Sequence, residues 1–96
     1  MNMTTKELLQ EYELELNLKE KIKYNDYEGI GRAFMLRGIL LNEVGDLTQE
    51  EYDEILKYEK VIENVYESLI AKYPQLKGVI EEGRSRMISY QLKLVA

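Results

Sequence analysis

The start and the periodicity of one segment, residues 48–73, limit the class of fold that this chain can adopt. Thr48-Gln49-Glu50-Glu51 has the spacing of a capping box, in which threonine and glutamate side chains bind the free backbone amides at a helix start. Apolar residues then recur at steps of three and four, as on one face of a helix. Pro74 ends the pattern, because a residue that precedes proline disfavours helical geometry. The segment predicts a helix over residues 49–72, with apolar positions at Tyr52, Ile55, Leu56, Ile62, Val65, Tyr66, Leu69 and Tyr73.

A different pattern, YELELNLK, occupies residues 12–19, where polar and apolar residues alternate as in a half-buried β-strand. Residues 6–21 contain no β-branched side chain and are rich in leucine, glutamate and lysine, which favour helices over strands. Thr4 and Glu7 also have capping-box spacing. We therefore expect a helix over residues 5–24. A strand paired between two chains is the alternative.

Two further helices are expected, over residues 27–44 and 75–94. The first follows a capping residue, Asn25 or Asp26, and contains the nearly unbroken apolar run AFMLRGILL. Gly45 is suited to end it in the left-handed conformation. The second carries a stripe with steps of four and three, in which glycine favours close approach between helices. Its alternative is two shorter helices, since Gly78 and Gly83 weaken a helix. The stripe consists of Leu76, Ile80, Gly83, Met87, Tyr90 and Leu94.

Together these segments predict an all-α fold. A chain of 96 residues is long enough for one domain, here a small bundle of three to four helices spanning residues 1–96. The apolar stripe of the last helix exceeds what so small a bundle needs, which favours a homodimer over a monomer. In that case the stripe residues would form the self-association surface.

The composition excludes several classes of chemistry. The chain has no cysteine and no histidine, so it lacks thiol catalysis, disulfides, the commonest general base and the commonest transition-metal ligands. No loop of the D-x-D-x-D-G type is present. We expect neither enzymatic activity nor a metal or other cofactor. The first residues lack the pattern of a signal peptide, and no apolar run reaches the roughly 18 residues of a membrane helix. These features predict a cytoplasmic protein without membrane contact.

Charge is distributed unevenly along the chain, whose net charge is −5. Residues 46–73 carry eight acidic residues against three lysines, and residues 74–96 carry four basic residues against two glutamates. The acidic and basic segments can pair within one fold or between subunits. A negative chain disfavours nucleic acid as a partner.

The candidate binding residues lie on the predicted helix 49–72. Glu59, Glu63 and Glu67 recur at every fourth residue, so they share one helix side. Tyr58 and Tyr66 accompany them, and tyrosine is enriched at protein interfaces. Such an acidic surface would mimic nucleic-acid phosphates or meet a basic partner. The alternative is a solvated helix face without a function in binding.

We therefore expect a protein-binding regulator or inhibitor that occludes a larger partner protein. Small, acidic, cysteine-free helical proteins of this kind resemble the regulators and inhibitors carried by bacterial viruses and mobile elements. One alternative is a self-associating structural protein that uses the stripe of the last helix. Another is a nucleic-acid-associated regulator that uses the basic residues Arg84, Arg86 and Lys93.

Overall fold

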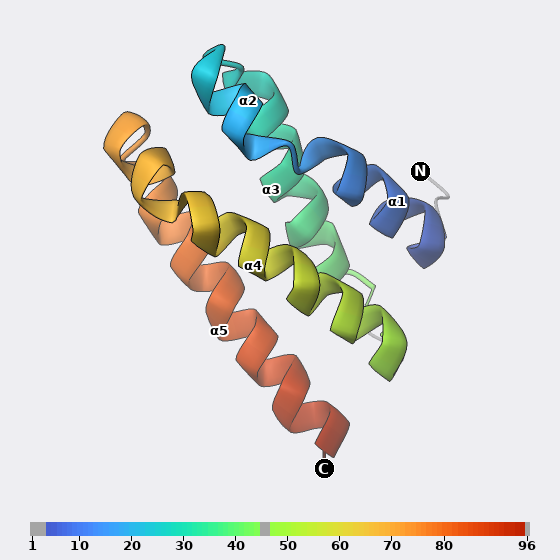
Figure 1. The fold of residues 1–96 in the computed structure, drawn as a ribbon. Coiled ribbons are helices and arrows are strands. Elements are labelled where there is room, and N and C mark those ends of the chain that lie inside the picture. Colours follow the sequence, from blue (N-terminus) through green and yellow to red (C-terminus); the bar gives the residue numbers. More distant parts are fainter. Residues whose placement is uncertain (1–3, 45–46, 96) are drawn as a thin grey trace.

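Five helices make up most of the described chain in a computed structural model that describes residues 4–44 and 47–95 (Figure 1). They are α1 (Thr5–Glu15), α2 (Leu18–Lys23), α3 (Tyr27–Asn42), α4 (Gln49–Lys72) and α5 (Leu76–Val95). The described residues contain no strand, so the all-α class is confirmed and the strand alternative for residues 12–19 is wrong. Within the described residues the number of helices is five, so the expected number of three to four is not confirmed.

The additional helix arises because residues 5–24 do not form one continuous helix. The chain breaks at Leu16 and Asn17, and the Leu18 amide donates to the Leu16 carbonyl over 2.7 Å. Leu16 and Leu18 are both buried. In an uninterrupted helix, two residues that are two positions apart point in nearly opposite directions, so only one could face the core. The break therefore allows two of the three leucines of the alternating segment, Leu16 and Leu18, to be buried, while Leu14 is exposed.

Two basic side chains, Lys21 and Arg32, contact Glu15, the last residue of α1 before the break. Lys21 donates to the backbone carbonyl of Glu15 over 2.7 Å and to its carboxylate over 2.9 Å. Arg32, from α3, lies 3.3 Å from the same carboxylate. The hydrogen bond from Lys21 holds the pKa of Glu15 below its ordinary value of 4.5, although partial burial opposes this effect. Glu15 thus joins three helices at the point where the first helical segment is interrupted.

The capping residues observed at the starts of α1, α3 and α4 are those predicted from the sequence. Thr4 with Glu7 and Thr48 with Glu51 form complete capping boxes at α1 and α4. At α3 the cap is Asp26, whose carboxylate accepts from the Gly29 amide over 3.0 Å. The predicted helix 49–72 is confirmed, and α3 ends at Asn42, two residues before the predicted end. The expected stop at Gly45 lies outside the described residues.

The last helix, α5, runs without interruption through Gly78 and Gly83, so the alternative of two shorter helices is wrong. It packs against α3 and α4 (Figure 1). Gly83 lies directly on the guanidinium of Arg37 from α3, where a β-carbon would collide with that group. The absence of a side chain at Gly83 thus leaves room for the Arg37 side chain of α3, and a close approach of the helix backbones at this position stays a prediction.

Most of the stripe on α5 faces the interior of its own chain. Leu76, Ile80 and Met87 belong to the hydrophobic core, and Tyr90 is half-buried beside it. The side chain of Leu94 lies outside the described residues. These contacts occupy the residues expected to join two copies, and self-association through them stays a prediction.

All five helices contribute to the core, which includes Tyr12, Leu18, Ile30, Leu40, Ile55, Leu69 and Ile80. In the part of the chain that the structure describes, no helix has both the length and the apolar character needed to cross a bilayer.

Candidate protein-interaction surface

The five predicted binding residues all lie on α4, but they point toward different neighbours. Tyr58 faces α1, where its ring meets Tyr12 edge-on at 5.4 Å between centroids. Glu63 and Tyr66 face α5 through Arg84. Glu67 is exposed and Glu59 is buried. The five residues therefore do not make up one continuous surface, because α1 and α5 lie on opposite sides of α4 (Figure 1).

Glu59 differs most from the expectation of a shared acidic face. Only 7% of its surface is exposed, and its Oε1 atom lies 2.6 Å from Nη2 of Arg37, which is 2% exposed. The same Nη2 atom donates to the Ile80 carbonyl over 3.5 Å. Glu59 lies four residues after Ile55 and three before Ile62, both core residues, so its spacing placed it on the buried stripe. Its role in the structure is that of a buried ion pair.

The surroundings of this ion pair are incompletely hydrogen-bonded. Among the described residues, the hydroxyl of Tyr12 and the Nε and Nη1 atoms of Arg37 are buried without hydrogen-bond partners. Burial raises the pKa of Tyr12, and burial also raises the pKa of Glu59, although the Arg37 guanidinium opposes the shift of Glu59. Unsatisfied buried polar atoms reduce stability, so this cluster is a costly part of the core.

On the α5 side, Arg84 connects two of the predicted residues. Its guanidinium lies over the ring of Tyr66 at 5.1 Å and reaches to 3.7 Å from the Glu63 carboxylate. Arg86 is paired with Glu82 of its own helix at 2.7 Å. Both arginines expected to contact nucleic acid are thus engaged with carboxylates of the chain.

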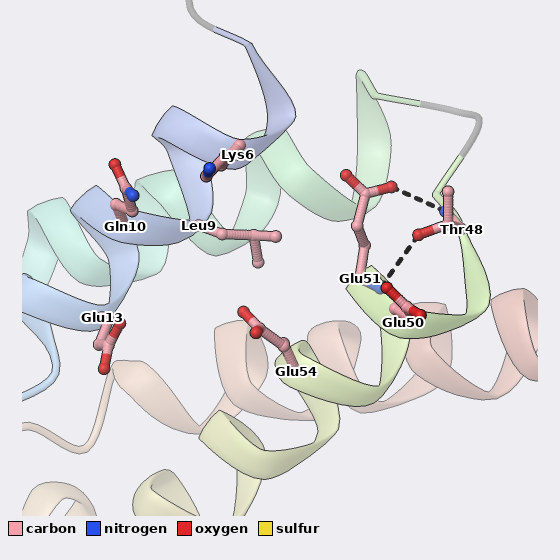
Figure 2. A pocket seen from close by; sticks show the side chains of 8 residues that line it. All are labelled: Lys6, Leu9, Gln10, Glu13, Thr48, Glu50, Glu51 and Glu54. Carbon is pink, nitrogen blue, oxygen red and sulfur yellow. Dashed lines mark hydrogen bonds between the residues drawn. The ribbon is translucent and has the colours of Figure 1, made fainter.

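On the α1 side, a groove of about 480 Å³ lies between α1 and the start of α4 (Figure 2). Figure 2 shows Leu9 of α1 and Glu54 of α4 directed toward the space between the two helices. The groove is lined by one lysine, four glutamates and three uncharged residues. They are Lys6, Leu9, Gln10, Glu13, Thr48, Glu50, Glu51 and Glu54.

The four carboxylates of this groove occupy two kinds of position: two lie in the first turn of α4 and two lie further along α1 and α4. Glu50 and Glu51 stand in the first turn of α4, where the helix dipole favours acidic side chains, and Glu51 closes the capping box by accepting from the Thr48 amide over 2.8 Å. Glu13 and Glu54 lie beyond these helix starts and flank Tyr58. Burial, together with these two carboxylates, raises the pKa of Tyr58 to about 12. Tyr58 therefore stays protonated and lies beside a strongly negative groove.

Sequence reasoning missed this groove because its two walls are far apart in the chain. The acidic start of α4 was visible as the run Glu50, Glu51, Asp53 and Glu54. The contribution of Glu13 was hidden in the alternating segment, and only the packing of α1 on α4 brings it to the groove. None of the five predicted residues lines the groove, although Tyr58 lies beside two of its glutamates, Glu13 and Glu54.

The carboxylates of the groove do not converge on a common centre. No group of three or more acidic side chains within residues 4–44 and 47–95 is placed to hold a metal ion. What the groove offers is a concave negative surface with an apolar base at Leu9, suited to a positively charged partner.

Comparisons with protein-family models, with curated proteins and with solved structures found no match for this chain.

Proposed function

We propose that this protein is a binding module without enzymatic activity that recognises a basic segment of a larger partner protein in the groove between α1 and α4. The observation that carries this proposal is the charge of the groove, in which four glutamates face a single lysine in about 480 Å³. A groove lined by four carboxylates and one lysine has a negative potential, which is complementary to a cationic partner.

The shape and composition of the groove define the kind of segment that fits. Leu9 supplies an apolar base, and the half-buried ring of Tyr58 lies beside Glu13 and Glu54. Tyrosine at the edge of such a surface contributes apolar area and a hydroxyl that donates a hydrogen bond. A segment with two or three lysine or arginine residues around one apolar side chain complements this arrangement.

In the cell, such a module acts by covering its partner's basic surface. A basic surface commonly binds nucleic acid or an acidic protein, so its occlusion makes this chain a regulator or inhibitor. This action matches the small acidic regulators of bacterial viruses and mobile elements, and we propose the same role in the cytoplasm here.

A binding measurement with a defined probe tests the groove. A labelled peptide rich in lysine and leucine is titrated with the wild-type protein and with the double variant Glu13→Gln/Glu54→Gln. We expect the variant to bind about tenfold more weakly, the effect of losing roughly 1.4 kcal/mol. A matched variant, Glu28→Gln/Glu43→Gln, removes two exposed carboxylates elsewhere and should keep wild-type affinity at moderate salt. Equal weakening by both variants would contradict the proposal, since it would reflect net charge alone.

A further inference from the structure

The buried side chain of Arg37 has hydrogen-bond donors that its ion pair with Glu59 does not use. Nη2 is paired with the Glu59 carboxylate and donates to the Ile80 carbonyl. In the part of the chain that the structure describes, Nε and Nη1 are buried without a hydrogen-bond partner, and the whole side chain is 2% exposed. Buried polar groups in folded proteins almost always have a partner, so these donors indicate an acceptor that comes from outside the chain.

A small pocket between α3 and α5 lies beside this guanidinium. Its lining includes Arg37 and also Gly83, which lies directly on the guanidinium because it has no side chain. The volume of the pocket is about 90 Å³. This is room for roughly three water molecules at about 30 Å³ each, or for one small oxyanion.

Two further donors border the same pocket. They are the guanidinium of Arg86, from α5, and the carboxamide of Asn42, the last residue of α3. Gly38 of α3 leaves the pocket open, since the nearest atom to a β-carbon at this position would be Nδ2 of Asn42, 3.8 Å away. Guanidinium groups bind oxyanions through charge-assisted hydrogen bonds. The lining thus presents two guanidinium cations and an amide donor against one carboxylate, that of Glu82.

The carboxylate of Glu82 lies where a bound oxyanion would replace it. Glu82 is paired with Arg86 over 2.7 Å, and its side chain is 65% exposed. Exposed pairs within one helix contribute little to stability, so an anion can displace Glu82 from Arg86 at little cost. Glu59 is not displaced, because it lies on Nη2 of Arg37 in the core.

We infer that the pocket between α3 and α5 binds a small oxyanion of the phosphate type, which accepts hydrogen bonds from Arg37, Arg86 and Asn42. An anion suits this site better than water, because both guanidinium groups are cations and one of them is almost completely buried. The bound ion would connect α3 to α5. This inference does not depend on the proposed function, since the pocket shares no lining residue with the α1–α4 groove.

Titration with sodium phosphate at constant ionic strength, followed by the amide signals in nuclear magnetic resonance spectra, tests the site. We expect saturable shifts centred on Gly38 and Gly83, with a dissociation constant at or below about 10 mM. Arg86→Gln should weaken binding about tenfold, because one charge-assisted hydrogen bond is lost. Gly38→Leu fills the pocket without removing a charge and should abolish saturable binding. The control is Arg32→Gln, which removes a 57% exposed arginine of α3 outside the pocket and should bind phosphate like the wild type.

Three results would overturn the inference. Shifts that do not saturate below about 100 mM phosphate, or equal weakening by Arg32→Gln and Arg86→Gln, would show an adventitious ion only. Saturable binding that survives Gly38→Leu would place the ion elsewhere. Circular dichroism verifies that each variant is folded, and Arg37 is left unchanged because its replacement would disrupt the core.

A second arm of the titration identifies the source of the oxyanion, since free phosphate and a phosphoserine residue share this chemistry. A phosphoserine peptide that binds more tightly than phosphate assigns the pocket to a phosphoryl group of a partner protein, and one that binds more weakly assigns it to the free ion.

Discussion

Nη2 of Arg37 and Oε1 of Glu59 lie 2.6 Å apart in the core, where Gly83 of α5 covers the guanidinium. This one contact joins α3 and α4 under α5. It also accounts for the arginine within the apolar run AFMLRGILL, since both charges are desolvated together. Removing both charges from water costs free energy that offsets much of their attraction, so the pair contributes little net stability while each charge depends on the other.

The two partners of the pair should therefore be strongly coupled. Arg37→Met or Glu59→Leu alone leaves one uncompensated buried charge and should lower the free energy of unfolding by about 3–5 kcal/mol. The double variant Arg37→Met/Glu59→Leu should recover most of that loss, because no charge remains in the core. Urea denaturation followed by circular dichroism gives all four free energies. The control is Arg86→Gln, which removes an exposed pair with Glu82 and should change stability by less than about 0.5 kcal/mol. Additive losses in the double variant would show that the two charges are not paired.

Two glycines of α5 should respond in opposite directions to the same substitution. Gly78→Ala places a β-carbon in open space and should stabilise the protein by about 0.5–1 kcal/mol, since alanine favours a helix. Gly83→Ala drives a β-carbon into the guanidinium of Arg37, so the gain in helix propensity should be outweighed by a net loss of about 1–3 kcal/mol. Thermal unfolding of both variants makes the comparison. A stabilised Gly83→Ala protein would place Arg37 elsewhere.

The contact of Glu15 with Lys21 should make stability depend on pH. The folded-state pKa of Glu15 is lowered, so its contribution is present above the ordinary value of 4.5 and is lost as the pH falls through the folded-state value. Glu15→Gln should therefore cost about 1 kcal/mol at pH 7 and almost nothing near pH 2. Parallel urea titrations at both pH values measure the difference. Glu11→Gln, an exposed change on the same helix, is the control. A loss that stays the same at both pH values would rule out the carboxylate as its cause.

Local signals in the sequence predicted much of the fold. The capping boxes at Thr4 and Thr48 and the three- and four-residue steps after Tyr52 depend on neighbours within a few residues, and they marked helix starts and the course of α4 correctly. The break at Leu16 was not predictable in this way. It exists because Leu16, at the break, and Leu18, in α2, are both buried, and that requirement arises only from the packed bundle.

The candidate surface was predictable only in part. Glu59 was grouped with Glu63 and Glu67 by its spacing of four, yet it also falls in register with Ile55 and Ile62, and only the second pattern matches its burial. Arg37 within an apolar run was the available sign of a buried partner for it. The α1–α4 groove needed the tertiary contact that brings Glu13 beside Glu54, which no local pattern encodes.

The most direct test of the central claim, that the acidic groove between α1 and α4 binds a basic partner protein, is affinity capture from a lysate of the native cell. The bait is the wild-type chain, Glu13→Gln/Glu54→Gln or the matched Glu28→Gln/Glu43→Gln, each with and without nuclease, and mass spectrometry identifies the captured proteins. We predict one near-stoichiometric protein with a basic surface that survives nuclease, is retained by the matched variant and is lost with the groove variant. Recovery of that protein in equal amount with the groove variant, or recovery of this chain alone, would contradict the claim.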